Sequence, residues 1–97
     1  MNVLVMAYAY VLRSLKNGRF YYGSTANLQE RLAKHNAGKV RSTKAYRPWV
    51  LHYVEQIETK GEAYRRELFF KSIDGYIWLK EQGIIDRTMC QEKTLQA

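Results

Sequence analysis

Ionisable and phenolic side chains occur at several positions where the surrounding pattern predicts ordered, partly buried structure. They are two tyrosines, an arginine, a histidine and a glutamate, namely Tyr10, Tyr21, Arg31, His35 and Glu67. A phenol or imidazole can position or activate a nucleophile, an arginine can stabilise charge on a phosphate, and a carboxylate can hold Mg²⁺ or Mn²⁺. Phosphodiester hydrolysis uses this combination, provided that the fold brings the five side chains together.

The two tyrosines lie in predicted strands over 6–14 and 19–24 that are separated by "NG", a strong signal for a two-residue hairpin turn. The expected cross-strand pairs are Lys16–Arg19, Ser14–Tyr21 and Tyr10–Thr25. Because side chains alternate between the faces of a strand, Tyr10 and Tyr21 would share one face and Tyr22 would point to the core on the other. Tyrosine is also common in strands, so core packing of both rings is the alternative.

The arginine and the histidine fall in a predicted helix over 28–37. Asn27 can cap its first turn, and Gly38 can end it in a left-handed conformation. Arg31 and His35 are one helical turn apart and next to the apolar stripe of this helix. The alternative is that both are surface residues at the edge of the stripe.

The glutamate falls in a second helix, predicted over 60–72. Glu67 lies on or near the apolar stripe of this helix, where a carboxylate is costly unless it is paired or holds a metal ion. The helix by itself leaves two possibilities open. Glu67 either forms a salt bridge, for example with Arg31 or Arg65, or binds a divalent cation.

The rest of the pattern predicts a basic loop over 39–47, a third strand over 48–58 and a short helix over 75–82. In the third strand, Trp49, Leu51 and Tyr53 are expected to alternate with Val50, His52 and Val54. The resulting order is β-β-α-β-α-α. It predicts an α+β domain with a small, mainly antiparallel, three-stranded sheet flanked by helices.

The length of 97 residues suits a single domain, expected over 1–84 and followed by a C-terminal tail over 85–97. The one cysteine, Cys90, forms no internal disulfide, and no Cys/His cluster has zinc spacing, which favours a reducing, cytoplasmic setting. The apolar run over 3–12 is shorter than the roughly 20 residues of a membrane span, so no membrane association is expected.

The net charge of +7 and the pI of about 9.7 favour a polyanionic partner, and nucleic acid in particular. The alternative for each basic residue is a solvated surface charge. The cations and the aromatic ring that we expect to contact DNA lie in the loop and near the hairpin; they are Arg13, Lys16, Lys39, Arg41, Lys44, Tyr46 and Arg47. Tyr46 is expected to stack on an exposed base.

The motifs follow one another in the order "YAYVL", "YYGS", "NLQERLAKHN" and "EAYRRELFFK" over about residues 6–80. In this order and spacing the chain resembles the GIY-YIG nucleases, and most closely the small single-domain bacterial type, the UPF0213-like proteins. "YAY" stands in for the first hallmark triplet and "YYG" for the second. The resemblance implies a DNA endonuclease that hydrolyses phosphodiester bonds with one Mg²⁺ or Mn²⁺ ion.

The resemblance also implies a role for each site residue. Tyr21 would bind or activate the attacking water, while Tyr10 would shape the site through its hydroxyl. Arg31 would steady the scissile phosphate, and His35 could shuttle a proton. Glu67 would be the metal ligand. Because no additional DNA-recognition domain is present, the resemblance implies little sequence specificity, with single-stranded or branched DNA as candidate substrates.

Two departures from the family pattern keep other functions open. No asparagine follows the glutamate helix, and Ser24 stands where some relatives have a lysine. The alternatives are a DNA-binding module with weak or no activity, and a subunit that needs a protein partner or forms a homodimer. A subunit that needs a partner would have an exposed aromatic patch formed by Tyr76 and Trp78.

Overall fold

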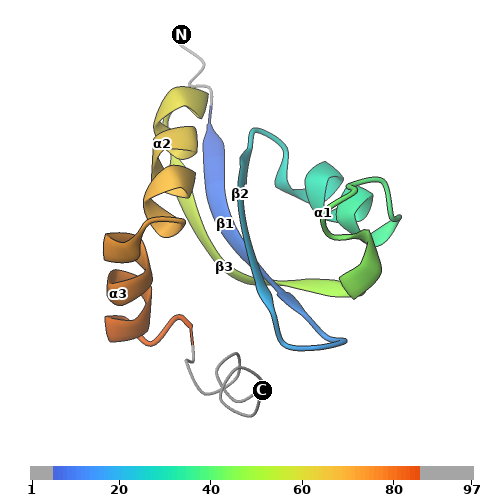
Figure 1. The fold of residues 1–97 in the computed structure, drawn as a ribbon. Helices are drawn as coiled ribbons and strands as arrows, with labels where there is room; N and C mark the ends of the chain where they lie inside the picture. The colour runs from blue at the N-terminus through green and yellow to red at the C-terminus, as the bar shows by residue number, and fades with distance from the viewer. Residues whose placement is uncertain (1–5, 86–97) are drawn as a thin grey trace, which may run out of the picture.

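The computed structural model describes residues 6–85, and the predicted α+β class and element order are confirmed (Figure 1). The elements are β1 (Ala7–Ser14), β2 (Phe20–Thr25), α1 (Leu28–Asn36), a 3-10 turn (Lys44–Tyr46), β3 (Trp49–Ile57), α2 (Lys60–Phe70) and α3 (Ile73–Glu81). Residues 86–97 of the predicted tail, which include Cys90, lie outside the described residues. Ile85, at the predicted start of that tail, is itself buried in the core.

The sheet has the order β2-β1-β3 with antiparallel pairing throughout, so β1 is central and β2 and β3 are edge strands. Helix α1 covers one face, while α2 and α3 cover the other (Figure 1). Each face has its own apolar cluster. Tyr10, Leu12 and Trp49 are buried beneath α1. Ala9, Val11, Phe70, Leu79 and Ile85 are buried beneath α2 and α3. None of the helices between residues 6 and 85 is long and apolar enough to cross a bilayer.

The hairpin between β1 and β2 has a longer loop than predicted. The observed pairs are Tyr10–Gly23, Leu12–Tyr21 and Arg13–Phe20, so the predicted register is wrong by two residues. The reason is that Ser14 Oγ accepts hydrogen bonds from the amides of Lys16 and Asn17, both at 3.1 Å, which widens the turn to residues 15–18. A shift of two residues preserves the faces of a strand, so Tyr10 and Tyr21 still share the α1 face. Tyr22 packs against Phe70 on the other face, as predicted.

The predicted alternation along β3 is wrong beyond Leu51. Leu12 pairs with Leu51, whereas the neighbouring Val11 pairs with Tyr53, so His52 is an extra residue in β3. Such a bulge reverses the faces of the residues that follow it. Trp49 is therefore buried beneath α1, while Tyr53 packs beneath α2 and α3.

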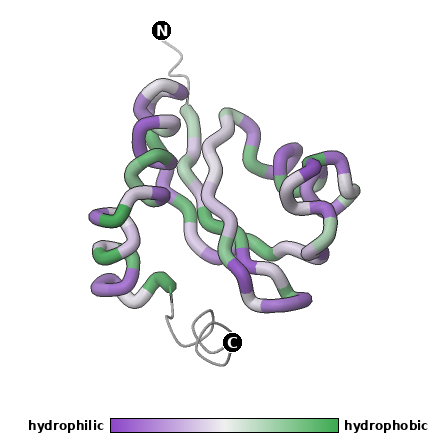
Figure 2. The backbone as a smooth tube through the Cα atoms, in the orientation of Figure 1, coloured by the Kyte–Doolittle hydropathy of each residue, from purple (hydrophilic) through white to green (hydrophobic). Residues whose placement is uncertain are grey.

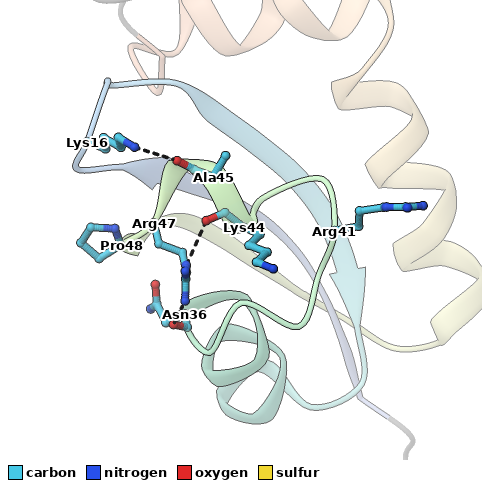
Figure 3. Close-up of a pocket in the computed structure, with 7 residues that line it drawn as sticks. All are labelled: Lys16, Asn36, Arg41, Lys44, Ala45, Arg47 and Pro48. Atoms are coloured by element: carbon cyan, nitrogen blue, oxygen red, sulfur yellow. Dashed lines mark hydrogen bonds between the residues drawn. The ribbon is translucent and has the colours of Figure 1, made fainter.

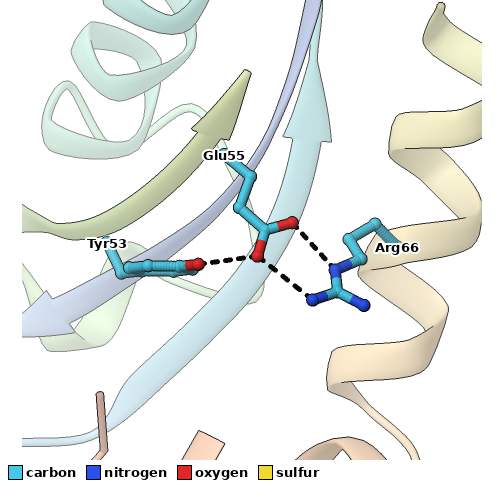
Figure 4. A network of polar contacts seen from close by, with 3 residues as sticks. All are labelled: Tyr53, Glu55 and Arg66. Carbon is cyan, nitrogen blue, oxygen red and sulfur yellow. Dashed lines mark hydrogen bonds and ion pairs between the residues drawn. The ribbon is translucent and has the colours of Figure 1, made fainter. Parts of the chain in front are cut away.

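A polar network joins β3 to α2 (Figure 4). Arg66 donates from Nε to Glu55 at 2.8 Å, and the Tyr53 hydroxyl donates to the same carboxylate at 2.6 Å. Burial, and to a lesser extent the hydrogen bond to Glu55, raises the pKa of Tyr53 to about 12. The Arg66 guanidinium also covers the half-buried Trp78 ring at 4.6 Å, so Trp78 does not form the exposed aromatic patch that was considered. These contacts fix α2 on the sheet, and with it the position of Glu67.

Candidate active site

The five candidate side chains come from four elements that meet around the edge strand β2. Tyr21 projects from β2 and Tyr10 from β1, while Arg31 belongs to α1 and Glu67 to α2, which packs on β2. Tyr10 and Tyr21 both contact His35 of α1, and Arg31 lies close enough to Tyr10, Tyr21 and Glu67 for all three to act on its charge. The pKa of Arg31 is raised chiefly by the neighbouring Tyr10 hydroxyl, with Tyr21 and Glu67 acting in the same direction.

A buried hydrogen-bond chain fixes the hydroxyl of Tyr10. Tyr10 Oη lies 3.1 Å from His35 Nε2, and His35 Nδ1 lies 2.8 Å from Thr43 Oγ1. Thr43 Oγ1 also donates to the carbonyl of Val40 at 3.3 Å, which uses its single hydrogen. Thr43 must therefore accept from His35 Nδ1–H, so His35 Nε2 is the acceptor for the Tyr10 hydroxyl. Thr43 thus selects the tautomer of His35.

The burial of this chain keeps both aromatic groups uncharged. Burial raises the pKa of Tyr10, an effect that the neighbouring Arg31 only partly offsets. Burial and then the charge of Arg31 lower the pKa of His35 to about 4. His35 is fully buried, so a proton can leave its ring only through Tyr10 or Thr43. Tyr10 at neutral pH is accordingly a phenol that donates to His35.

Tyr21 is placed differently from Tyr10. Its ring packs edge-on against His35 and Trp49, with centroids 5.0 and 6.2 Å apart. The side chain is partly exposed, and its hydroxyl has no hydrogen-bond partner among residues 6–85. Of the two predicted tyrosines, Tyr21 therefore has the hydroxyl that is available to a ligand.

Gly23 is required by the position of the Tyr10 ring. The two residues pair directly across the hairpin, and the Tyr10 ring crosses over the Gly23 backbone. A Cβ atom at Gly23 would overlap the Tyr10 hydroxyl and its ring carbon. The glycine therefore allows the Tyr10 hydroxyl to reach His35.

We expect Gly23→Ala to lower the free energy of unfolding by about 1–3 kcal/mol, because the Tyr10 ring must move within a packed cluster and away from His35. Urea unfolding measures this change. Gly61→Ala is the control, since a Cβ atom at Gly61 meets no atom within 4 Å and alanine is the better helix residue. Equal stability of both variants would contradict the role of Gly23.

Glu67 is paired, although not with either predicted arginine. Its Oε1 accepts from Ser24 Oγ at 2.6 Å, and its Oε2 accepts from Lys71 Nζ at 2.7 Å. The glutamate side chain is 13% exposed. Arg31 forms no ion pair with Glu67, and its buried Nε has no hydrogen-bond partner within the described part of the chain. Arg31 is thus a cation with an unsatisfied donor beside the two tyrosines.

The predicted DNA contacts separate into two groups. Lys16, Arg41, Lys44 and Arg47 line one pocket of about 590 Å³ (Figure 3). The other three residues are placed elsewhere. Arg13 follows Val11 on the α2 face, and Lys39 is exposed outside the pocket lining. Tyr46 packs against the cluster beneath α1, and the Arg19 guanidinium covers its ring at 4.8 Å, so stacking on a base is blocked on that side.

Three residues of the site were missed by the sequence reasoning. Lys71 could have been found, because it is four residues after Glu67 on the same helix face. Ser24 was seen only as a departure from the family pattern, not as a partner of Glu67. Thr43 carried no signal, since its contact with His35 depends on the path of an irregular loop.

Residues 6–74 match the family model described as the GIY-YIG catalytic domain. A UPF0213 protein of Bacillus licheniformis is 45% identical over 67 residues, which is 68% of each chain. A UPF0213 protein of Staphylococcus haemolyticus is 44% identical over 66 residues, 67% of this chain and 79% of the relative. A UPF0213 protein of Halobacterium salinarum is 36% identical over 69 residues, which is 70% of this chain and 88% of the relative. No solved structure matches this chain significantly. The extent of the family match and these identities establish that the chain belongs to the GIY-YIG nuclease family.

Proposed function

We propose that this protein is a divalent-metal-dependent DNA endonuclease that hydrolyses phosphodiester bonds with little sequence specificity. The observation that carries the proposal is the convergence of Tyr10, Tyr21, Arg31 and Glu67 from four elements at the edge of the sheet. A free phenol, a cation with an unsatisfied donor and a carboxylate are the groups that hydrolysis of a phosphodiester needs.

In this proposal, the free Tyr21 hydroxyl orients the attacking water. The Arg31 guanidinium binds the scissile phosphate, which supplies the acceptor that its Nε lacks. Tyr10 retains its proton and donates it in a hydrogen bond to His35, so the lone pairs of its oxygen face Arg31 and hold the guanidinium in place. His35 and Thr43 act as positioning residues for Tyr10.

The carboxylate of Glu67 suits a hard divalent ion. Mg²⁺ is commonly bound through one or two carboxylates, with water and substrate phosphate completing its shell. Among residues 6–85 no cluster of three or more His, Cys, Asp or Glu side chains could form an all-protein metal cage. Glu67 would therefore hold one Mg²⁺ or Mn²⁺ ion, which when bound would neutralise charge on the phosphate.

Lys71 is expected to compete with that ion. Its ammonium group holds Glu67 Oε2 at 2.7 Å, and the lysine side chain is 46% exposed. We expect Lys71→Met to strengthen Mn²⁺ binding by up to about fivefold, the equivalent of a partly exposed ion pair. Calorimetric titration of Mn²⁺ into the protein without DNA measures this, with Lys80→Met as the control. Unchanged or weaker binding in Lys71→Met would show that the lysine is no competitor.

Cleavage of labelled single-stranded, duplex and branched DNA in Mg²⁺ or Mn²⁺, by the wild type and by Glu67→Ala, tests the function. We expect the wild type to cut and the variant to lose cutting while it still folds and binds the same DNA. Binding without cutting by the wild type would instead support a DNA-binding module. The missing asparagine and the occupied carboxylate of Glu67 favour that second candidate.

A further inference from the structure

The basic pocket lies between the hairpin turn and the stretch of chain formed by the end of α1 and the segment that follows it (Figure 3). The hairpin turn contributes Lys16, the end of α1 contributes Asn36, and the segment after α1 contributes the rest. The full lining is Lys16, Asn36, Arg41, Lys44, Ala45, Arg47 and Pro48. It contains four cations and no carboxylate, which is the composition of a site for an anion.

Two of the cations are held in place by backbone carbonyl groups. Lys16 Nζ donates to the carbonyl of Ala45 at 3.1 Å, and Arg47 Nε donates to that of Lys44 at 2.9 Å (Figure 3). A carbonyl fixes the cation without cancelling its charge, as a carboxylate would. Lys16 and Arg47 form no ion pair within residues 6–85, so their remaining N–H donors can serve a ligand.

The backbone also makes room for the Arg47 side chain. A Cβ atom at Gly38 would lie 2.7 Å from Arg47 Nη1, and Gly38 has a φ of +80°, which favours glycine. The guanidinium can therefore lie against the end of α1, where it also reaches the carbonyl of Asn36 at 3.5 Å. Arg41 and Lys44, by contrast, are exposed, and within the described residues their side chains have no hydrogen bond or ion pair.

The positive charge of the protein is concentrated in the part of the chain that builds this pocket. Nine of the 16 lysines and arginines precede residue 55, against one of the nine acidic residues, Glu30. Hydrophilic residues cover the hairpin turn and much of the region around α1 (Figure 2). The field of this half of the molecule therefore attracts polyanions toward the pocket.

We propose that this pocket is a phosphate-binding subsite for the DNA backbone, separate from the phosphate position at Arg31. The assignment of DNA as the ligand rests on the proposed function. The pocket is linked to the candidate active site, because Arg41 and Lys44 flank Thr43, which bonds His35. A strand held in the pocket by its phosphates would be anchored next to the site without being read for sequence.

The test is DNA binding in EDTA, where no cutting interferes, as a function of salt concentration. Arg41→Ala/Lys44→Ala removes two cations that have no partners in the described structure. Arg65→Ala/Lys80→Ala removes the same charge from α2 and α3 and is the matched control. We expect the pocket variant to bind roughly tenfold or more weakly near 0.1 M salt, with the slope of log affinity against log salt smaller by up to about 1.8 for duplex DNA. The control is expected to keep the wild-type slope.

An equal loss of DNA affinity in both double variants would assign the effect to net charge and overturn the subsite. The subsite would also be overturned if the pocket variant bound DNA as tightly as the wild type. Titration of the protein with inorganic phosphate as the only ligand distinguishes a site for small anions from a site for the DNA backbone. Pocket-dependent phosphate binding together with unchanged DNA binding would overturn the DNA assignment. The nuclease proposal is tested apart from this by cutting in Mg²⁺. If the pocket variant both binds DNA and cuts it like the wild type, the subsite is refuted and the nuclease proposal stands.

Discussion

Replacing Arg31 with alanine is expected to lower the rate of DNA cleavage on the order of 10²–10³-fold, the typical cost of losing one donor that stabilises transition-state charge. The expectation rests on the buried Nε, which has no partner among residues 6–85, and on the neighbouring Tyr10 and Tyr21, which place the guanidinium at the proposed phosphate position. Arg31→Lys is expected to recover only part of the rate, because an ammonium group cannot replace the two-pronged donor geometry of arginine. Single-turnover cleavage at saturating DNA in Mg²⁺ separates this loss from weaker binding.

Arg65→Ala is the control for the Arg31 variants. Arg65 is exposed on α2, so this variant loses the same charge and is expected to cut at the wild-type rate. Circular dichroism and the urea midpoint establish that each variant is folded. A cleavage rate within threefold of wild type in Arg31→Ala would rule out contact between Arg31 and the scissile phosphate.

The stability of the protein is expected to fall by about 3 kcal/mol as the pH decreases from 6.5 to 4, because of His35 alone. The unfolded chain takes up a proton near the ordinary pKa of 6.5, whereas the folded chain resists protonation until about 4. The unfolded state therefore binds more protons in this range, so the stabilisation is fully present above pH 6.5 and is lost as the pH falls toward 4. Protonated His35 also cannot accept from Tyr10, which disrupts the buried chain.

Urea unfolding across this pH range measures the decline, and comparison with His35→Gln isolates it from the titration of the carboxylates. We expect the difference in stability between the wild type and His35→Gln to shrink as the pH falls. His52→Gln leaves His35 as the single histidine and is expected to retain the full decline. Nuclear magnetic resonance of the His35 ring provides a direct measurement. Titration of that ring near pH 6.5 would contradict the neutral, buried imidazole.

The order of the elements and the side-chain faces of the hairpin could be predicted from the sequence because they depend on local patterns. The cap at Asn27 was predicted and is formed, with Asn27 Oδ1 accepting from the Glu30 amide at 3.0 Å. The helix at the end of the domain begins two residues earlier than predicted, because Ser72 caps it through the Gly75 amide. The predicted hairpin register was wrong by two residues, but the predicted face of each side chain was still correct, since side chains alternate with a period of two.

Other features depended on contacts between segments far apart in the chain. The bulge in β3 changed which face Tyr53 occupies, and nothing in the local alternation indicates an extra residue. Likewise, the sequence left Glu67 as either an ion-pair partner or a metal ligand. The structure shows that Lys71 and Ser24 hold it, with Ser24 coming from the neighbouring strand.

The sequence by itself determined the types of side chain available and the elements that carry them, because periodicity, caps and turns are local. Only the tertiary structure decided which of the two tyrosine hydroxyls lacks a hydrogen-bond partner in the described part of the chain. Tyr10 and Tyr21 are equivalent by type and share a face, but Tyr10 is buried against His35, while Tyr21 lies on the edge strand. The same holds for His35, whose tautomer is set by Thr43 through a loop that no periodic pattern describes. Burial and hydrogen bonding are properties of the packed chain, so they separate residues that the sequence alone cannot distinguish.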